Sequence, residues 1–104
     1  MENFVEHIKL IDGAFSPAEA AEVLLSLIND KIKFHTVQAL NLKTGYNENS
    51  SESEQRILQL KQAKEIVKSL VVDARNKDYE VLIDSDIKIK LTKRKHNHYA
   101  KLNP

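Results

Sequence analysis

The chain of 104 residues contains no cysteine, only two glycines and two prolines, and no long hydrophobic run. Without cysteine there is no disulfide framework, no thiol nucleophile and no cysteine-ligated zinc or iron–sulfur site. The scarcity of glycine and proline indicates long regular elements, which disfavours a sandwich or barrel of many strands. No apolar stretch approaches the roughly 18 residues of a membrane-spanning helix, and the first residues lack the pattern of a signal peptide. We therefore predict a bacterial, cytoplasmic protein that does not bind membranes.

The charge of the chain is unevenly distributed. Hydrophobic residues make up 41% of the sequence and charged residues 30%, which is typical of a soluble globular chain. The net charge is +1, yet residues 93–104 contain four basic residues and no acid (+4), so the other residues sum to −3. We predict a single α+β domain over residues 1–92, followed by a basic C-terminal tail over residues 93–104.

The start of the first helix is marked by three residues. Ser16 is a good N-cap, because its hydroxyl can accept a hydrogen bond from a backbone N–H that lacks a partner, and Glu19 completes a capping box. Pro17 occupies the first helical position, where its missing N–H removes no hydrogen bond. The apolar periodicity continues through Asn29-Asp30 without a phase change, despite their low helix propensity. These features predict one helix over about residues 17–43.

This first helix has apolar residues on two sides. One stripe has the width of an ordinary core-facing stripe and contains Ala21, Leu24, Leu25, Ile28, Ile32, His35, Ala39 and Leu42. A second stripe lies roughly half a turn away and contains Val23, Leu27, Phe34 and Val37. A helical hairpin alone covers only one of these sides. We therefore expect the second side to be covered by the chain's own sheet or by a second copy.

Residues 52–76 predict a second helix with a single broad apolar stripe. Ser51 and Glu54 have capping-box spacing at its start. The stripe contains Leu60, Ala63, Ile66, Val67, Leu70, Val71 and Ala74. Two helices of matched length, joined by a short polar loop, predict a long antiparallel helical hairpin.

The two ends of the chain show the period of two that is typical of strands. Residues 4–11 predict the first strand, which Asp12-Gly13 are expected to end. Residues 79–91 alternate as well, and Asp84-Ser85-Asp86 favour a turn between two strands, because Asp and Ser suit turns. One long strand is the alternative. The predicted fold is therefore α+β, with the helical hairpin packed on a small antiparallel sheet in the order β-α-α-β-β.

No combination of residues predicts catalysis, a cofactor or a metal site. His35 has no ligand-type residue at i+4, which favours a hydrogen-bonded histidine in the core or in an interface. His96 and His98 could face one metal ion together, but two imidazoles are too few for a closed site. Asp84 and Asp86 lack the further oxygen ligands of a calcium loop. We therefore expect a protein that is not an enzyme and that uses no cofactor or metal.

The second apolar side of the first helix carries the functional hypothesis. We expect Val23, Leu27, Phe34 and Val37 to form an interface. The chain would then be a non-enzymatic protein–protein interaction or scaffolding module, self-associating as a homodimer through its helices or binding an unidentified protein.

The alternative function is accessory nucleic-acid binding by the tail, which offers cations and an aromatic ring: Lys93, Arg94, Lys95 and Tyr99. The sequence pI of about 8.0 argues against it, because dedicated nucleic-acid binders are more basic.

Overall fold

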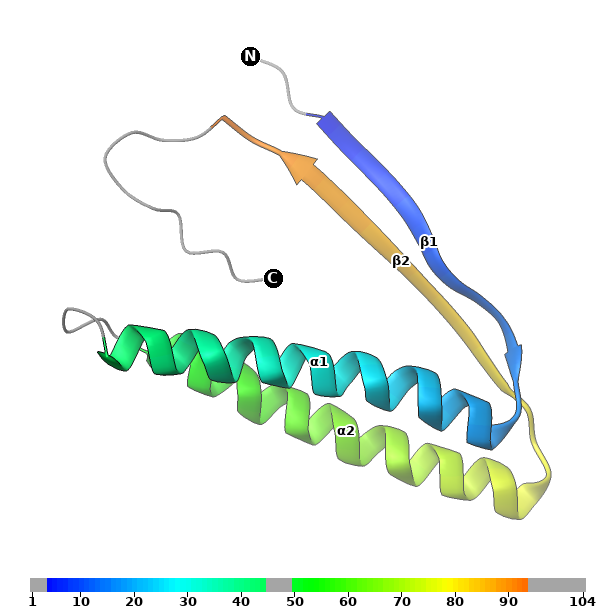
Figure 1. Cartoon of the computed structure of the whole chain (residues 1–104). Coiled ribbons are helices and arrows are strands. Elements are labelled where there is room, and N and C mark those ends of the chain that lie inside the picture. Colours follow the sequence, from blue (N-terminus) through cyan, green and yellow to red (C-terminus); the bar gives the residue numbers. More distant parts are fainter. Residues whose placement is uncertain (1–3, 45–49, 94–104) are drawn as a thin grey trace. The chain divides into compact units, whose positions relative to one another are not determined.

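The computed structural model describes residues 4–44 and 50–93. Their elements follow the order β1 (Phe4–Phe15), α1 (Pro17–Thr44), α2 (Ser51–Lys77) and β2 (Val81–Leu91) (Figure 1). The chain divides into two compact units. One contains α1 and α2, which we call the helical hairpin, and the other contains most of β1 and β2, which we call the ribbon. The predicted α+β class with a helical hairpin is confirmed. The packing of the hairpin on the sheet stays a prediction.

The first helix starts as its capping residues predict. The backbone N–H of Glu19 donates to Ser16 Oγ over 3.1 Å, and the N–H of Ser16 donates to Glu19 Oε1 over 3.0 Å. This reciprocal pair is the expected capping box, which satisfies donors that no helical carbonyl can reach. The helix then continues through Asn29-Asp30 without a break. The predicted boundaries of 17–43 therefore agree with the structure to within one residue.

The second helix differs slightly from its prediction at both ends. Its N-cap is Ser50 and not Ser51, and the Ser50 side chain makes no capping hydrogen bond. At the other end Asp78 adopts the left-handed conformation (φ 60°, ψ 46°), which Asp tolerates better than most residues. The N–H of Tyr79 donates to the carbonyl of Ala74 over 2.8 Å, which closes the last turn as in a Schellman motif.

α1 and α2 run side by side in opposite directions and pack against each other (Figure 1). Apart from Leu60, the buried residues in the described part of the hairpin have small or polar side chains: Ala20, His35, Ala39, Ser50, Ser53 and Ala74. Small residues let two helix backbones approach closely. One side of each helix is therefore covered by its partner helix, and the remaining sides need other neighbours.

The predicted turn in the last strand is wrong. β2 is one strand over Val81–Leu91, so the order is β-α-α-β and not β-α-α-β-β. The reason is pairing with β1, which runs antiparallel to β2 (Figure 1). Lys9 Nζ on β1 lies 2.7 Å from Asp84 Oδ1 on β2. This hydrogen bond to Asp84 raises the pKa of Lys9 above its ordinary value.

The first strand is longer than predicted, because it continues through Asp12-Gly13 to Phe15. Gly13 keeps a negative φ, so the backbone stays extended instead of turning. Side chains alternate between the two faces of a strand. The Lys9–Asp84 contact therefore identifies a polar face of the ribbon, which also carries Asp86, Lys88 and Lys90. By the same alternation Val5 and Leu82 lie with these charged residues. The opposite face, which we call the apolar face, carries Phe4, Glu6, Ile8 and Leu10 of β1 and Val81, Ile83, Ser85, Ile87, Ile89 and Leu91 of β2.

Candidate interaction surface

The interface predicted on α1 is largely exposed. Leu27, Phe34 and Val37 are 39%, 44% and 49% exposed, whereas Val23 is half-buried. An open hollow of about 670 Å³ lies along the second half of this helix, lined by Asp30, Lys33, Phe34, Val37, Gln38 and Asn41. Leu27, Phe34 and Val37 therefore lie on a side of α1 that α2 leaves largely uncovered, and their role in an interface stays a prediction.

The second helix extends this surface with Ile66 and Leu70, which are 60% and 59% exposed. On α1 the predicted interface residues lie about 80° to 160° before His35 around the helix axis, at about 100° per residue. Ile66 and Leu70 lie about 80° to 120° before Leu60 on the same scale. In two antiparallel helices that face each other, the residues that come before the facing residue around each helix axis lie on the same side of the hairpin. We call this side the apolar flank: Val23, Leu27, Phe34, Val37, Ile66 and Leu70.

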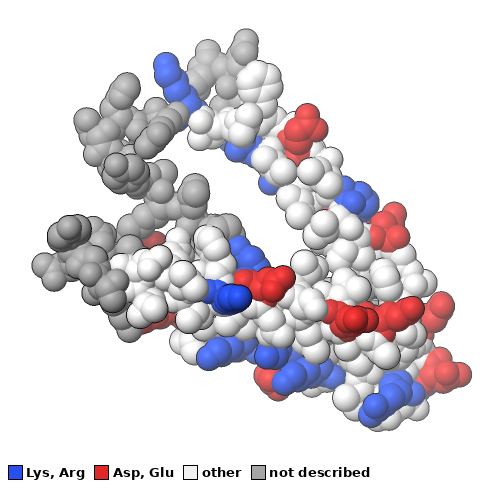
Figure 2. Space-filling model, in the orientation of Figure 1, with Lys and Arg blue, Asp and Glu red and all other residues white. Residues whose placement is uncertain are grey.

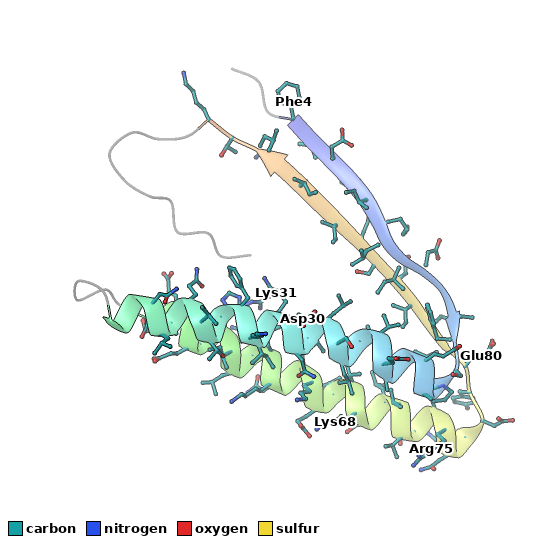
Figure 3. All side chains as sticks on the ribbon, in the orientation of Figure 1. Phe4, Asp30, Lys31, Lys68, Arg75 and Glu80 are labelled. Atoms are coloured by element: carbon teal, nitrogen blue, oxygen red, sulfur yellow. The ribbon has the colours of Figure 1, made fainter. Side chains whose placement is uncertain are left out.

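The opposite side of α2 carries a row of basic residues, which we call the basic flank: Lys61, Lys64, Lys68 and Arg75. These residues lie about 40° to 100° after Leu60, in the opposite rotational sense to the apolar flank. Figure 2 shows basic side chains gathered along α2. In Figure 3, Lys68 and Arg75 project from α2 away from the side on which Lys31 of α1 lies. Within residues 4–44 and 50–93, only Lys68 of the four has an ion pair, with Glu65 at 3.4 Å.

A buried polar group joins the two helices near the start of α2. His35 is fully buried, and its Nδ1 lies 3.2 Å from Oε1 of Gln38. Ser53 of α2 donates its hydroxyl to the same amide oxygen over 2.9 Å. His35 Nε2 has no hydrogen-bond partner among the described residues. Because the Ser53 hydroxyl is directed to Gln38 and not to the imidazole, these side chains form a structural link and no nucleophile–base pair.

Two cations lie beside this link. Lys31 Nζ lies 5.2 Å from the centre of the Phe34 ring, and the Phe34 and His35 rings pack in a T-shaped arrangement with their centres 5.2 Å apart. Burial lowers the pKa of Lys31, and the positive charge of Arg56 lowers it further. The charge of Arg56 on α2 therefore acts on Lys31 of α1.

Of the remaining predicted site residues, the structure describes only one. Lys93 is exposed, whereas Arg94, Lys95 and Tyr99 of the alternative nucleic-acid site, together with His96 and His98, lie outside the described residues. In the part of the chain that is described, no three His, Asp or Glu side chains lie close enough to hold a metal ion. No helix described here combines the length and apolar character required to cross a bilayer.

With this geometry in place, the chain was compared with known proteins. No protein-family model matches it, and neither a curated protein nor a solved structure shows significant similarity. The function must therefore be argued from the surfaces described above.

Proposed function

We propose that this chain is a non-enzymatic interaction or scaffolding module that self-associates as a homodimer, using the apolar flank of the helical hairpin. The observation that carries the proposal is the exposure of Leu27, Phe34 and Val37 on α1 and of Ile66 and Leu70 on α2. Apolar side chains in water are unfavourable by about 25 cal/mol per Å², so several of them along one side of the hairpin indicate a partner.

A second copy fits this surface better than the ribbon alone. The width of a two-stranded ribbon is about 10 Å, because strands lie about 4.8 Å apart. Two packed helices present a face about twice as wide, since their axes lie 8–10 Å apart and each helix is about 10 Å across. A second copy supplies a face of the same width with matching apolar side chains.

Light scattering on the full chain tests the proposal. The expected mass at micromolar concentrations is twice the chain mass of 11.9 kDa. Val37→Glu and Phe34→Glu place a charge in the flank and should weaken the dimer at least about tenfold. Asn29→Glu adds the same charge to an exposed position outside the flank and is the matched control. A wild-type chain that stays monomeric at high micromolar concentration would contradict the proposal.

A second candidate function is binding of a nucleic-acid backbone, favoured by the basic flank. Lys61 and Arg75 are 14 residues apart, or about 21 Å along the helix axis, so the row could follow several phosphates. Binding would be electrostatic, and its affinity would fall steeply with salt.

A labelled DNA duplex tests this second function at low and physiological salt. Lys61→Glu with Lys64→Glu should lower its affinity at least about tenfold and flatten the salt dependence. Lys33→Glu with Lys77→Glu makes the same charge change at exposed positions outside the basic flank. Equal losses in both double variants would show that only net charge matters. A separate variant, with Lys93, Arg94 and Lys95 replaced by alanine, reports on the tail.

A further inference from the structure

The outer edge of β2 is long and has no partner strand in the described part of the chain. Within residues 4–44 and 50–93 the sheet contains only β1 and β2, so each strand pairs along one edge. β2 spans 11 residues, Val81–Leu91, and therefore presents a full row of backbone N–H and C=O groups on its other edge. Such an edge is a template for pairing with another strand unless it is short, bulged, covered or protected by charged side chains.

The charges of β2 are arranged symmetrically around one residue. The sequence Asp84-Ser85-Asp86-Ile87-Lys88-Ile89-Lys90 has two acids before Ile87 and two lysines after it, at matching distances. The four charged residues share the polar face of the ribbon, because they are separated by even numbers of positions. All four are exposed, and the Asp84 side chain is 72% exposed even with Lys9 beside it.

We propose that β2 pairs edge to edge with β2 of a second copy, antiparallel, about a twofold axis at Ile87. In this register Asp84 lies opposite the partner's Lys90, and Asp86 lies opposite the partner's Lys88. The symmetry repeats both pairs, which gives four cross-strand pairs of opposite charge. On the apolar face Ile87 meets its own counterpart, and Ile83 lies opposite the partner's Leu91.

The charges select this register over its neighbours. A shift that centres the pairing on Asp86 places this carboxylate opposite its own counterpart, and a shift to Lys88 does the same with two ammonium groups. Like charges directly opposite each other destabilise a sheet. Parallel in-register pairing would stack every charge on its own kind. A slip that pairs residues of unlike parity would bring apolar and polar faces together.

The resulting sheet has four strands in the order β1-β2-β2-β1. A two-stranded sheet is marginal in water, whereas three or more strands with an apolar face are stable. The strand pairing therefore supplies what each ribbon lacks alone. It specifies one contact of the self-association proposed above and rests on that proposal.

Charge-changed variants of the full chain test the pairing. Asp84→Lys with Asp86→Lys makes the edge all basic, and Lys88→Asp with Lys90→Asp makes it all acidic. Each variant alone should dimerise at least about tenfold more weakly than wild type. A one-to-one mixture should recover a mixed dimer, because opposite charges then face each other. Lys9→Ala removes the pair within the ribbon but leaves the edge intact, so its dimer should match that of wild type.

Single cysteines then read the register directly, because the chain has none of its own. Opposite residues in an antiparallel pair are close enough for a disulfide. Ile87→Cys should therefore cross-link efficiently with diamide as oxidant. Ile89→Cys should cross-link poorly, since the two thiols would be about 13 Å apart, four residues at about 3.3 Å each.

The outcomes separate the two proposals. Three results would each overturn the strand pairing and leave a helix-mediated dimer standing. The all-basic and all-acidic variants could dimerise as tightly as wild type, their mixture could form no mixed dimer, or Ile87→Cys and Ile89→Cys could cross-link equally well. A monomeric wild type would overturn both.

Discussion

The two ends of the helical hairpin bury different kinds of side chain. Where α1 begins and α2 finishes, the buried residues are Ala20 and Ala74, and we call this the alanine end. Where α1 approaches its last turns and α2 begins, His35 and Ser53 are buried with Gln38 between them, and we call this the polar end. Alanine permits close approach of the helices but has no preferred direction, whereas a hydrogen bond is directional. We infer that the alanine end sets the helix spacing and that the polar end sets the register.

The largest effect is expected at the alanine end. Ala20 is 0% exposed, so Ala20→Leu must insert three carbons into a closed seam and should lower the free energy of unfolding by about 1–3 kcal/mol. Ala18→Leu introduces the same side chain two residues away at an exposed position and should change it by less than about 0.5 kcal/mol. Urea denaturation measures both. Equal effects would show that the seam at Ala20 is loosely packed.

At the polar end, His35→Leu should have the opposite sign. The substitution removes the buried Nε2, whose lack of a partner costs about 1–3 kcal/mol, and gives up a Nδ1 bond with a net value of about 0.5–1.5 kcal/mol. Ser53 still satisfies the Gln38 oxygen. The expected result is a gain of about 1 kcal/mol, with a raised melting temperature. His35→Ala leaves a cavity and should be destabilising, so equal losses in both variants would refute this account of Nε2.

A smaller loss is expected from Ser53→Ala, which breaks the cross-helix hydrogen bond to Gln38. The bond is 2.9 Å long, and its removal should lower the free energy of unfolding by about 0.5–1.5 kcal/mol. Alanine also has a higher helix propensity than serine, which partly offsets the loss. Ser69→Ala, at an exposed position of the same helix, measures that offset separately. If the two variants behaved alike in thermal denaturation, the link between the helices would contribute nothing.

The sequence predicted the features of this fold that are local. The capping residues Ser16 and Glu19 marked the start of α1 to the residue, because both hydrogen bonds lie within one turn. The turn expected at Asp84-Ser85-Asp86 failed for the converse reason. Those residues prefer turns in isolation, but pairing with β1 holds them extended, and Lys9 is 75 positions away from Asp84. Local propensity cannot anticipate a partner at that separation.

The candidate surface also has features that the sequence predicted from local pattern and features that it did not predict. The exposed side of α1 followed from the helical period alone, because one neighbouring helix covers only one stripe. The sequence did not indicate that Ile66 and Leu70 are exposed, because both belong to the same apolar stripe as the buried Leu60. Their exposure depends on which part of that stripe faces α1, and only the structure gives this. The link from Gln38 to Ser53 requires the register of the hairpin, and no short motif contains both residues. A glutamine and a serine near facing helix ends are a weak signal that could have suggested it.

The smallest effect concerns Lys31, and its size depends on pH. Because burial and then Arg56 lower its pKa in the folded chain, the unfolded chain binds this proton more tightly. The resulting penalty is fully present below the folded pKa and disappears as the pH rises towards the ordinary lysine value of 10.5. Lys31→Met should therefore raise the free energy of unfolding at neutral pH by less than about 0.5 kcal/mol, because the site is partly open to solvent. Above pH 10.5 the substitution should leave that free energy unchanged. Lys33→Met, exposed on the same helix, should show no such convergence in urea denaturation across pH. A gain that persisted above pH 10.5 would mean that better packing, and not the removal of a charge facing Arg56, stabilises the variant.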